Sequence, residues 1–524
     1  MPTPADIWAD ADLPVRRLAG VALNPSTPAD LLPRLLADAP LAVRMVLCRD
    51  RVLPDAVVDA VVAHPDARTR GFFAQNPHVD PAQRALLVRD PDWFVRAHLA
   101  EGPRPAKTGP AGSGYLPDDA VVHMITTYEA ELLGGGFHRQ ISAEFRRAMP
   151  THPEARVRAW GTGSWSVLPA GTRAALLADP DDDVRRRAEQ RVREEDPVWV
   201  ESVLPSHACH GRTDALLHLP LTAKVVRGVL TDPSGADDRA MIARNPSLPP
   251  DAVARLAADP DPEVRRETAS RADLGPAERR ALVADPDPRV RRTAARHPDL
   301  GPDERAALAA DADPRVRLSV SVHPAWSETE RAAIDYRVPA DGDFSAELRP
   351  LPPRDAEAVR RDALSGHPLL RREAARERTL PPDLVARLAV DDDLGVRVLL
   401  AQNHPGAPPG LLLRCFLAYT GSGREHLLAR PDFPSAGLAV HAADDDPAVR
   451  ALAARDPETE PHVVERLTRD PDPAVRAAFA RHPNLPPSRL AELLDDEELA
   501  HRAAANPALP LTRIRRLVAA LPHG

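Results

Sequence analysis

The sequence has few of the residues that mark a secreted or membrane-embedded protein. Its 524 residues include only three cysteines, which are too few and too scattered for a disulfide framework. No apolar run is long enough to span a membrane, and the N-terminus lacks the basic-then-apolar pattern of a signal peptide. We therefore expect a cytoplasmic protein that makes no membrane contact.

Aromatic residues and lysine are also scarce. Aromatic residues make up 4% of the chain, so the core must be built from Leu, Val and Ala, which favours closely packed short helices. Lysine occurs only at Lys107 and Lys224, a depletion that indicates coding bias rather than a site selected for arginine. Acidic residues outnumber basic ones by 77 to 68, and this net charge of −9 argues against a general affinity for nucleic acid.

What the sequence does contain is an internal repeat of 26 or 27 residues. A motif of the type Asp-Pro-x-Val-Arg returns in a constant register, and we call its arginines the column arginines. Two gaps in this register, from Arg96 to Arg158 and from Arg317 to Arg371, each leave room for one degenerate unit, giving about nineteen units. The column arginines are Arg16, Arg44, Arg70, Arg96, Arg158, Arg185, Arg212, Arg239, Arg265, Arg291, Arg317, Arg371, Arg397, Arg424, Arg450, Arg476 and Arg502.

Each unit predicts two short helices. In residues 248–257 proline stands at the first helical positions and the apolar residues share one face, which predicts a first helix, A. Asp261-Pro262 supplies an N-cap and a proline at the first position of a second helix, B, which carries the column arginine and runs to about Ser270. Helices of about ten residues are unstable alone and must pack on their neighbours. The sequence therefore predicts an all-α solenoid of two-helix repeats.

The pattern N-P-x-L-P-P followed by L-A-x-D-P-D-P-x-V-R resembles the bacterial leucine-rich repeat variant family, and its D-P-x-V-R core also resembles HEAT-like repeats. The resemblance covers most of the chain and implies a right-handed superhelix. A member of that family carries an N-terminal iron–sulfur cluster on clustered cysteines. Here the first 200 residues contain only Cys48, so we expect no cluster.

Two irregular segments divide the expected solenoid. We expect N-terminal repeats in 1–101, an insertion in 102–136, central repeats in 137–337, a loop insertion in 338–353 and C-terminal repeats in 354–524. The first insertion contains a helix-like stretch, 117–133, and the second stands where a helix B is expected. Each insertion is either a tolerated surface segment or a contact loop.

Half of the six tryptophans lie within 40 residues, and they are the candidate binding residues: Trp160, Trp165 and Trp199. Tryptophan is enriched at binding hot spots, but large rings also fill gaps next to glycines, such as Gly161 and Gly163. Both interpretations stay open.

No catalytic residue or cofactor site can be assigned. The densest group of soft ligands is His207, Cys209 and His210, but no zinc-binding frame accompanies it, so we expect no metal there. Seven His-Pro pairs are expected to cap helix ends, because stacked repeats lie about 10 Å apart, too far for shared metal ligation. These histidines are His64, His152, His297, His323, His367, His404 and His482. Three Asp triplets, beginning at Asp181, Asp391 and Asp444, are expected to be helix N-caps.

The first hypothesis is a non-enzymatic, monomeric scaffold that binds a protein partner along its curved surface. The alternative is a superhelix that binds nucleic acid through helix B arginines, including Arg185 to Arg187, Arg265-Arg266 and Arg291-Arg292. Against it, an Asp precedes nearly every such arginine and can pair with it. A metal or redox role at His207, Cys209 and His210 is a second alternative.

Overall fold

The computed structural model describes residues 11–103, 114–132, 136–340, 344 and 355–522, and in these residues every regular element is an α-helix or a 3₁₀-helix. The chain forms two compact units. Unit 1 combines residues 1–164 with residues 434–524, and unit 2 consists of residues 165–433. The predicted all-α solenoid of two-helix repeats is confirmed.

One repeat shows why these residues form two helices. Helix α18 (Pro250–Ala257) buries Val253 and Leu256, and helix α19 (Pro262–Ala269) buries Val264. The Asp261 carboxylate accepts the backbone N–H of Glu263 at 2.8 Å and so caps α19. These bounds agree with the predicted helices A and B.

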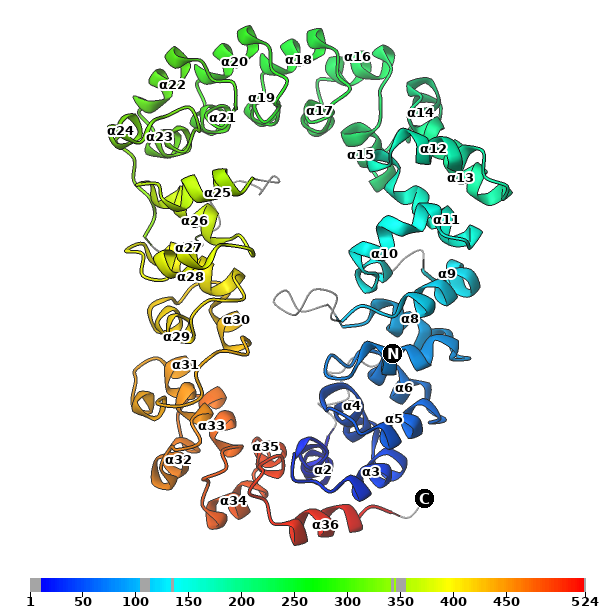
Figure 1. Ribbon diagram of the computed structural model, residues 1–524, viewed down its shortest axis with the longest axis vertical. Coiled ribbons are helices and arrows are strands. Elements are labelled where there is room, and N and C mark those ends of the chain that lie inside the picture. Colours follow the sequence, from blue (N-terminus) through cyan, green and yellow to red (C-terminus); the bar gives the residue numbers. More distant parts are fainter. Residues whose placement is uncertain (1–10, 104–113, 133–135, 341–343, 345–354, 523–524) are drawn as a thin grey trace. The chain divides into compact units, whose positions relative to one another are not determined.

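Unit 2 stacks such repeats in two layers. In Figure 1 the A helices α18, α20 and α22 form one row and the B helices α17, α19 and α21 form the other. The A helices of unit 2 are α12 (Ala170–Leu177), α14 (Pro197–Val203), α16 (Ala223–Thr231), α18, α20 (Pro276–Val283), α22 (Pro302–Ala309), α24 (Glu328–Ala332), α25 (Ala356–Ala363), α27 (Pro382–Leu388) and α29 (Pro409–Ala418). The B helices are α13 (Asp182–Glu194), α15 (His210–His218), α17 (Ala236–Ala243), α19, α21 (Pro288–Ala294), α23 (Pro314–Ser321), α26 (Pro368–Ala375), α28 (Leu394–Asn403) and α30 (Arg424–Leu428).

Unit 1 is built from both ends of the described chain. Its B helices are α2 (Leu13–Leu23), α4 (Leu41–Asp50), α6 (Ala67–Ala74), α8 (Trp93–Glu101), α11 (Ala155–Gly161), α31 (Pro447–Arg450), α33 (Pro473–Ala480) and α35 (Ala500–Ala504). Its A helices are α3 (Leu32–Asp38), α5 (Asp55–Val62), α7 (Pro81–Ala85), α10 (Ala143–Ala148), α32 (Pro461–Leu467), α34 (Pro487–Leu493) and α36 (Leu511–Ala519), with 3₁₀ turns between them. Helix α9 (Asp118–Leu132) is the stretch predicted at 117–133.

Column arginines join each repeat to the next. The Arg265 guanidinium donates to both oxygens of Asp285, 20 residues further on, at 2.7 and 3.1 Å, and to the Asp259 carbonyl at 2.7 Å. The hydrogen bond from Arg450 holds the pKa of Asp470 below its ordinary value. The same pairing recurs in Arg70–Asp90, Arg239–Asp259, Arg291–Asp311, Arg371–Asp391 and Arg450–Asp470.

A second contact between repeats caps the carboxyl end of several B helices. The Asn245 side chain donates to the carbonyls of Leu216 and Leu219 in the preceding repeat, at 2.9 and 2.8 Å. Histidine does the same where it replaces asparagine: His482 Nε2 donates to the Asp456 carbonyl at 2.8 Å. These side chains satisfy carbonyls that a helix end leaves without a partner.

The His-Pro pairs, which we expected to share one helix-end position, occupy several. His297, His323, His404 and His482 follow a B helix, whereas His64 and His152 lie before one. His367 caps the N-terminus of α26, where it accepts the Leu369 N–H at 3.1 Å. The three Asp triplets do supply N-caps, through Asp181, Asp393 and Asp446.

The second break in the repeat follows α24. Ser327 and Glu330 form the predicted capping box there. Residues 333–340 contain no helix, and the next helix of the described residues is α25, another A helix. Most of the predicted 338–353 insertion lies outside the described residues, as does most of the 102–114 segment.

Candidate functional site

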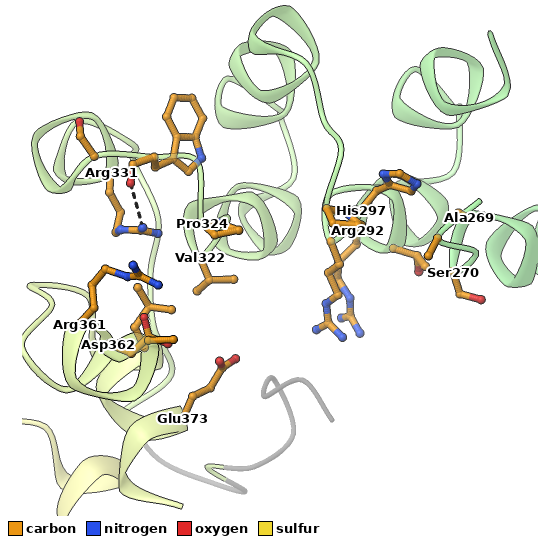
Figure 2. Close-up of a pocket in the computed structure, with 18 of the residues that line it drawn as sticks. Ala269, Ser270, Arg292, His297, Val322, Pro324, Arg331, Arg361, Asp362 and Glu373 are labelled. Atoms are coloured by element: carbon orange, nitrogen blue, oxygen red, sulfur yellow. Dashed lines mark hydrogen bonds between the residues drawn. The ribbon is translucent and has the colours of Figure 1, made fainter. Parts of the chain in front are cut away.

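Unit 2 contains a pocket of about 1000 Å³ beside the repeat break at α24 (Figure 2). One wall comes from the carboxyl ends of the B helices α19 and α21 and the turns that follow them. The other wall comes from α24, α25 and α26. The pocket therefore lies where one A helix follows another with no helix B described between them.

The charge of the pocket is opposite to that of the chain. Six arginines and three carboxylates line it, although acidic residues outnumber basic ones in the whole sequence. Burial, with the nearby Arg279 guanidinium, lowers the pKa of His297, so this lining histidine is neutral at pH 7. The charged lining residues are Arg266, Arg271, Arg292, Arg296, Arg331, Arg361, Glu328, Asp362 and Glu373.

Some of these arginines also hold the fold. Arg271 donates to the Ala243 carbonyl at 2.8 Å and pairs with Asp273 at 2.7 Å. Arg266 pairs with Glu263 on its own helix. Arg292 and Arg361 lie on opposite sides of the pocket in Figure 2, and Arg361 is an exposed residue.

Apolar groups line the pocket between the charges. Val322, Pro324 and Leu370 contribute aliphatic surface, and Trp326 contributes an indole whose Nε1 donates to the Val320 carbonyl at 2.9 Å. The Arg305 guanidinium lies 5.3 Å from the centre of the Trp326 ring. A pocket with apolar walls and a few fixed charges suits a ligand that has both characters.

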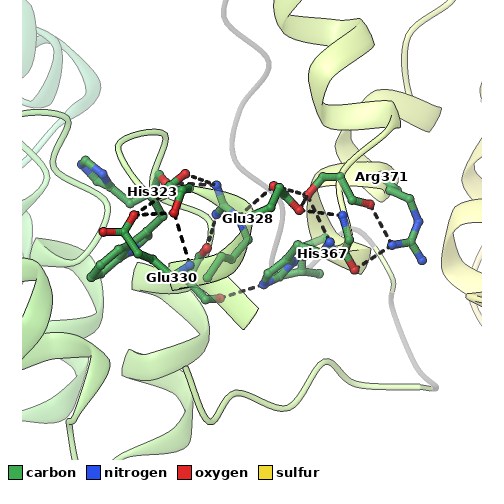
Figure 3. Close-up of polar contacts among 12 residues, drawn as sticks. His323, Glu328, Glu330, His367 and Arg371 are labelled. Atoms are coloured by element: carbon green, nitrogen blue, oxygen red, sulfur yellow. Dashed lines mark hydrogen bonds and ion pairs between the residues drawn. The ribbon is translucent and has the colours of Figure 1, made fainter. Parts of the chain in front are cut away.

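A polar network crosses the break and joins α24 and α26 to each other and to the end of α23 (Figure 3). Glu328 on α24 accepts the Gly366 N–H at 2.7 Å and the Ser365 hydroxyl at 2.9 Å, just before α26. Burial opposes the ionisation of Glu328, but these hydrogen bonds and the charge of Arg331 outweigh it and hold its pKa below the ordinary value. Arg331 in turn donates to the Ser321 carbonyl at the end of α23.

His367 is the most deeply buried member of this network. Its Nδ1 accepts the Leu369 N–H, so Nε2 carries the proton and donates to Ser321 Oγ at 2.8 Å. The Tyr336 ring stacks on its imidazole at 4.2 Å. Burial, together with the charges of Arg331, Arg371 and Arg372, lowers the pKa of His367 to about 3.

Each of the three candidate tryptophans has its own surroundings. Trp160 in unit 1 is half-buried, packs edge-on against Phe137 and donates to Glu129 Oε1 at 2.9 Å. Trp165 in unit 2 is 6% exposed and donates to Glu195 Oε1 at 3.1 Å. Trp199 is half-buried on α14 beside the exposed Val198. Their role in binding stays a prediction, and the structure gives Trp160 and Trp165 packing roles as well.

The soft ligands do not assemble into a metal centre. His207 and His210 are exposed and Cys209 is half-buried, and the described residues contain no group of three His, Cys, Asp or Glu side chains arranged to hold a metal ion. Burial raises the pKa of the Cys48 thiol to about 12 and that of Cys415 to about 11, which disfavours the reactive thiolate.

Many arginines of the nucleic-acid hypothesis are paired within the chain. Arg265 and Arg291 bind Asp285 and Asp311 of the next repeat. Arg185, Arg186 and Arg187 pair with Asp182 and Asp183 on the same helix. These guanidinium groups are therefore occupied by the protein itself.

Sequence reasoning found the break but missed the pocket beside it. Arg331 repeats the helix A position of Arg279 and Arg305, so the spacing alone does not single it out, and Trp326 lies 127 residues beyond the tryptophan cluster. The only signal was the pair of consecutive A-type helices around the 338–353 segment.

Comparisons with known proteins add little to this description. No protein-family model matches the sequence, and no curated protein matches it. The solved structure of a leucine-rich repeat variant is similar over 61% of this chain and 98% of its own, with 22% identity and a TM-score of 0.24. An engineered protein is similar over 82% of this chain and 98% of its own, with 14% identity and a TM-score of 0.13. Such low TM-scores carry no argument, so the fold is described from this chain's own helices.

One further observation concerns the membrane. Among the helices of the described ranges, none combines the length and the apolar character needed to cross a bilayer.

Proposed function

We propose that the protein is a non-enzymatic repeat scaffold that binds an acidic segment of a partner polypeptide in the arginine-lined pocket of unit 2. The observation that carries the proposal is the excess of arginine over carboxylate in a pocket of a chain that is acidic overall. Arginine pairs readily with carboxylates through two parallel hydrogen bonds. The partner segment supplies carboxylates for the guanidinium groups and an apolar side chain for the Val322, Trp326 and Leu370 surface.

The size of the pocket supports a polypeptide ligand. Its volume of about 1000 Å³ is at the upper end of the range for small-molecule sites. The proposal assigns no catalytic step. The pairing of column arginines with aspartates supports it over the nucleic-acid alternative, because those arginines are already engaged.

The test is affinity capture with charge-reversed variants. Arg292→Glu and Arg361→Glu change opposite sides of the pocket, and Arg315→Glu makes the same charge change at an exposed position of α23 outside the lining. We expect a stoichiometric protein to be captured by the native chain and by Arg315→Glu, and to be lost with the double pocket variant.

Salt and nuclease treatment distinguish a protein partner from a nucleic-acid partner. Nucleic acid that is captured at low salt and lost steeply as salt rises would support the superhelix that binds nucleic acid, because phosphate contacts release counterions. A protein partner captured equally by all variants would overturn the pocket as its site.

A further inference from the structure

The inference concerns the first and last described helices of unit 1. Helix α2 carries the column arginine Arg16 and is a B helix, whereas α36 follows the last B helix and is an A helix. Among the described residues, the A helix that packs against α2 from the preceding side is α36, and the B helix stacked on it from that side is α35; α3 is the A helix that follows. Helices α36 and α2 therefore make up one repeat, which we call the closing repeat.

The closing repeat uses the same contacts as consecutive repeats. Asn24 donates to the carbonyls of Ala504 and Asn506, at 2.9 and 2.6 Å. Asn506 makes the equivalent pair to Ala480 and His482, at 3.0 and 2.8 Å. The side chain that follows a B helix therefore bonds to the end of the previous B helix in both cases, although Asn24 reaches across about 480 residues of sequence.

Further polar contacts extend the joint on both helix layers. Arg17 Nε donates to the Leu494 carbonyl at 2.6 Å, and the same guanidinium pairs with Asp495. On the A-helix side, Arg515 on α36 pairs at 3.0 Å with Asp30, which lies in the 3₁₀ turn just before α3. These charged contacts give the joint specificity for this pair of surfaces.

A glycine sets how closely α2 and α35 approach. A Cβ atom at Gly20 would clash with the His501 carbonyl and lie 2.6 Å from the Ala504 Cβ. Gly20 and Ala504 are both fully or almost fully buried in this joint. Small residues on both sides therefore let the two helix backbones come together.

A solenoid ordinarily ends in stacking faces that need a polar cap, because an uncovered face is apolar. Here each end face is covered by the other. We propose that the surface of α2 and the surface of α35 and α36 are a complementary pair of docking surfaces. In the native chain these two surfaces bind each other. When this contact within a chain is open, the same surfaces join two copies of the chain head to tail. The occupant of each face is thus a second copy of this chain, docked through the same contacts.

This inference goes beyond the proposed function and does not rest on the pocket. Within one chain the two faces are held at high effective concentration, so closure in the same molecule prevails in the native protein. Opening the joint gives a heterologous interface, which links copies in a row rather than in a symmetric pair.

The test uses two variants that each damage a different face at one point of contact. Gly20→Val places a side chain against the α35 backbone and leaves the α35 face native. Ala504→Leu enlarges the opposing side chain and leaves the α2 face native. Each variant alone should be open and monomeric, since its native face has no native partner in another copy. An equimolar mixture should form a heterodimer of twice the mass of one chain, because one native joint can form between the two variants.

Mass measurement by light scattering during gel filtration, over a series of concentrations, gives the readout. Limited proteolysis of α2 should be faster in each variant alone and slower in the mixture. Gly228→Val is the matched control, because Gly228 is an exposed helical glycine whose Cβ position meets nothing within 4 Å. Mixed with Ala504→Leu, it should form a heterodimer no more readily than the native chain does.

Two results would overturn the proposal. One is a mixture of the two folded, open variants that stays monomeric at every concentration, which would show that the faces do not dock between chains. The other is α2 that stays protected from protease in each variant, which would show that the Gly20 contact does not hold the joint. Native circular dichroism of both variants distinguishes these results from misfolding.

Discussion

The closing repeat of unit 1 and the break in unit 2 are two solutions to one structural problem. In both places the local sequence does not continue the alternation of A and B helices. At the closing repeat, α36 and α2 supply the two helices from distant parts of the chain, and α2 packs against both α35 and α36. At the break, hydrogen bonds of Glu328, Arg331 and His367 join α23, α24 and α26, and a pocket remains beside them.

The difference indicates where each kind of interaction is used. Close apolar packing with a glycine at the contact restores the stacking of the repeat, and it leaves no room for a ligand. A polar network, such as the one that joins α23, α24 and α26, fixes the positions of helices without filling the space beside them. The comparison predicts that the closing repeat contributes mainly to stability and that the pocket side chains contribute mainly to binding.

The largest expected effect is that of Gly20→Val on stability. The new side chain meets the His501 carbonyl and Ala504 of α35, so the helices must separate. We expect the free energy of unfolding to fall by about 3 kcal/mol, the upper part of the range for overpacked sites. Urea denaturation followed by circular dichroism measures this change, with Gly228→Val as the control that should change stability far less. Equal losses in the two variants would remove the distinction between the joint and an ordinary helix surface.

The next effect compares asparagines inside and outside the closing repeat. Asn24→Ala and Asn245→Ala each remove two hydrogen bonds to buried carbonyls of the preceding repeat. We expect each to lower the free energy of unfolding by about 2 kcal/mol. The two losses should agree to within about 0.5 kcal/mol if the closing repeat is equivalent to consecutive repeats. A negligible loss for Asn24→Ala alone would contradict that equivalence.

The third effect is a pH dependence of the free energy of unfolding, which arises from His367 at the repeat break. The pKa of His367 is about 3 in the folded protein against an ordinary value of 6.5, so the unfolded chain binds a proton that the folded protein does not. The free energy of unfolding is therefore not reduced by His367 above pH 6.5. It falls as the pH drops from 6.5 toward 3, by up to about 1.4 kcal/mol for each pH unit. His367→Gln cannot titrate there, so its stability should fall less steeply with acid than that of the native chain. Chemical denaturation at pH 7, 6 and 5 checks this slope, and parallel slopes would exclude His367 as its source.

Much of the repeat could be predicted from the sequence, because its signals are local. Asp261 and Pro262 specify where α19 begins, and the spacing of Val253 and Leu256 specifies the buried face of α18. The closing repeat was missed because Asn24 and Ala504 are brought together only by the path of the whole solenoid.

The pocket was missed for a different physical reason. Its charge arises from side chains on several helices: Arg266 and Arg292 follow the 26-residue repeat, whereas Arg361 on α25 does not share that spacing with them, and only the fold brings these helices to one pocket. The sequence did indicate the break itself, because the register of column arginines skips one unit between Arg317 and Arg371. It could not indicate that a polar network would hold that break open.

The smallest expected effect on stability is that of Arg361→Glu, which tests whether the pocket side chains serve binding rather than the fold. Arg361→Glu changes an exposed side chain of the pocket, so its free energy of unfolding should change by less than about 0.5 kcal/mol. Its effect on binding should be large, because a carboxylate placed in the pocket repels an acidic partner segment. Arg315→Glu should change neither property. Thermal denaturation and partner capture, both measured on the native chain, Arg361→Glu and Arg315→Glu, separate the effect on stability from the effect on binding. A large loss of stability in Arg361→Glu would assign the pocket arginines to the fold rather than to binding.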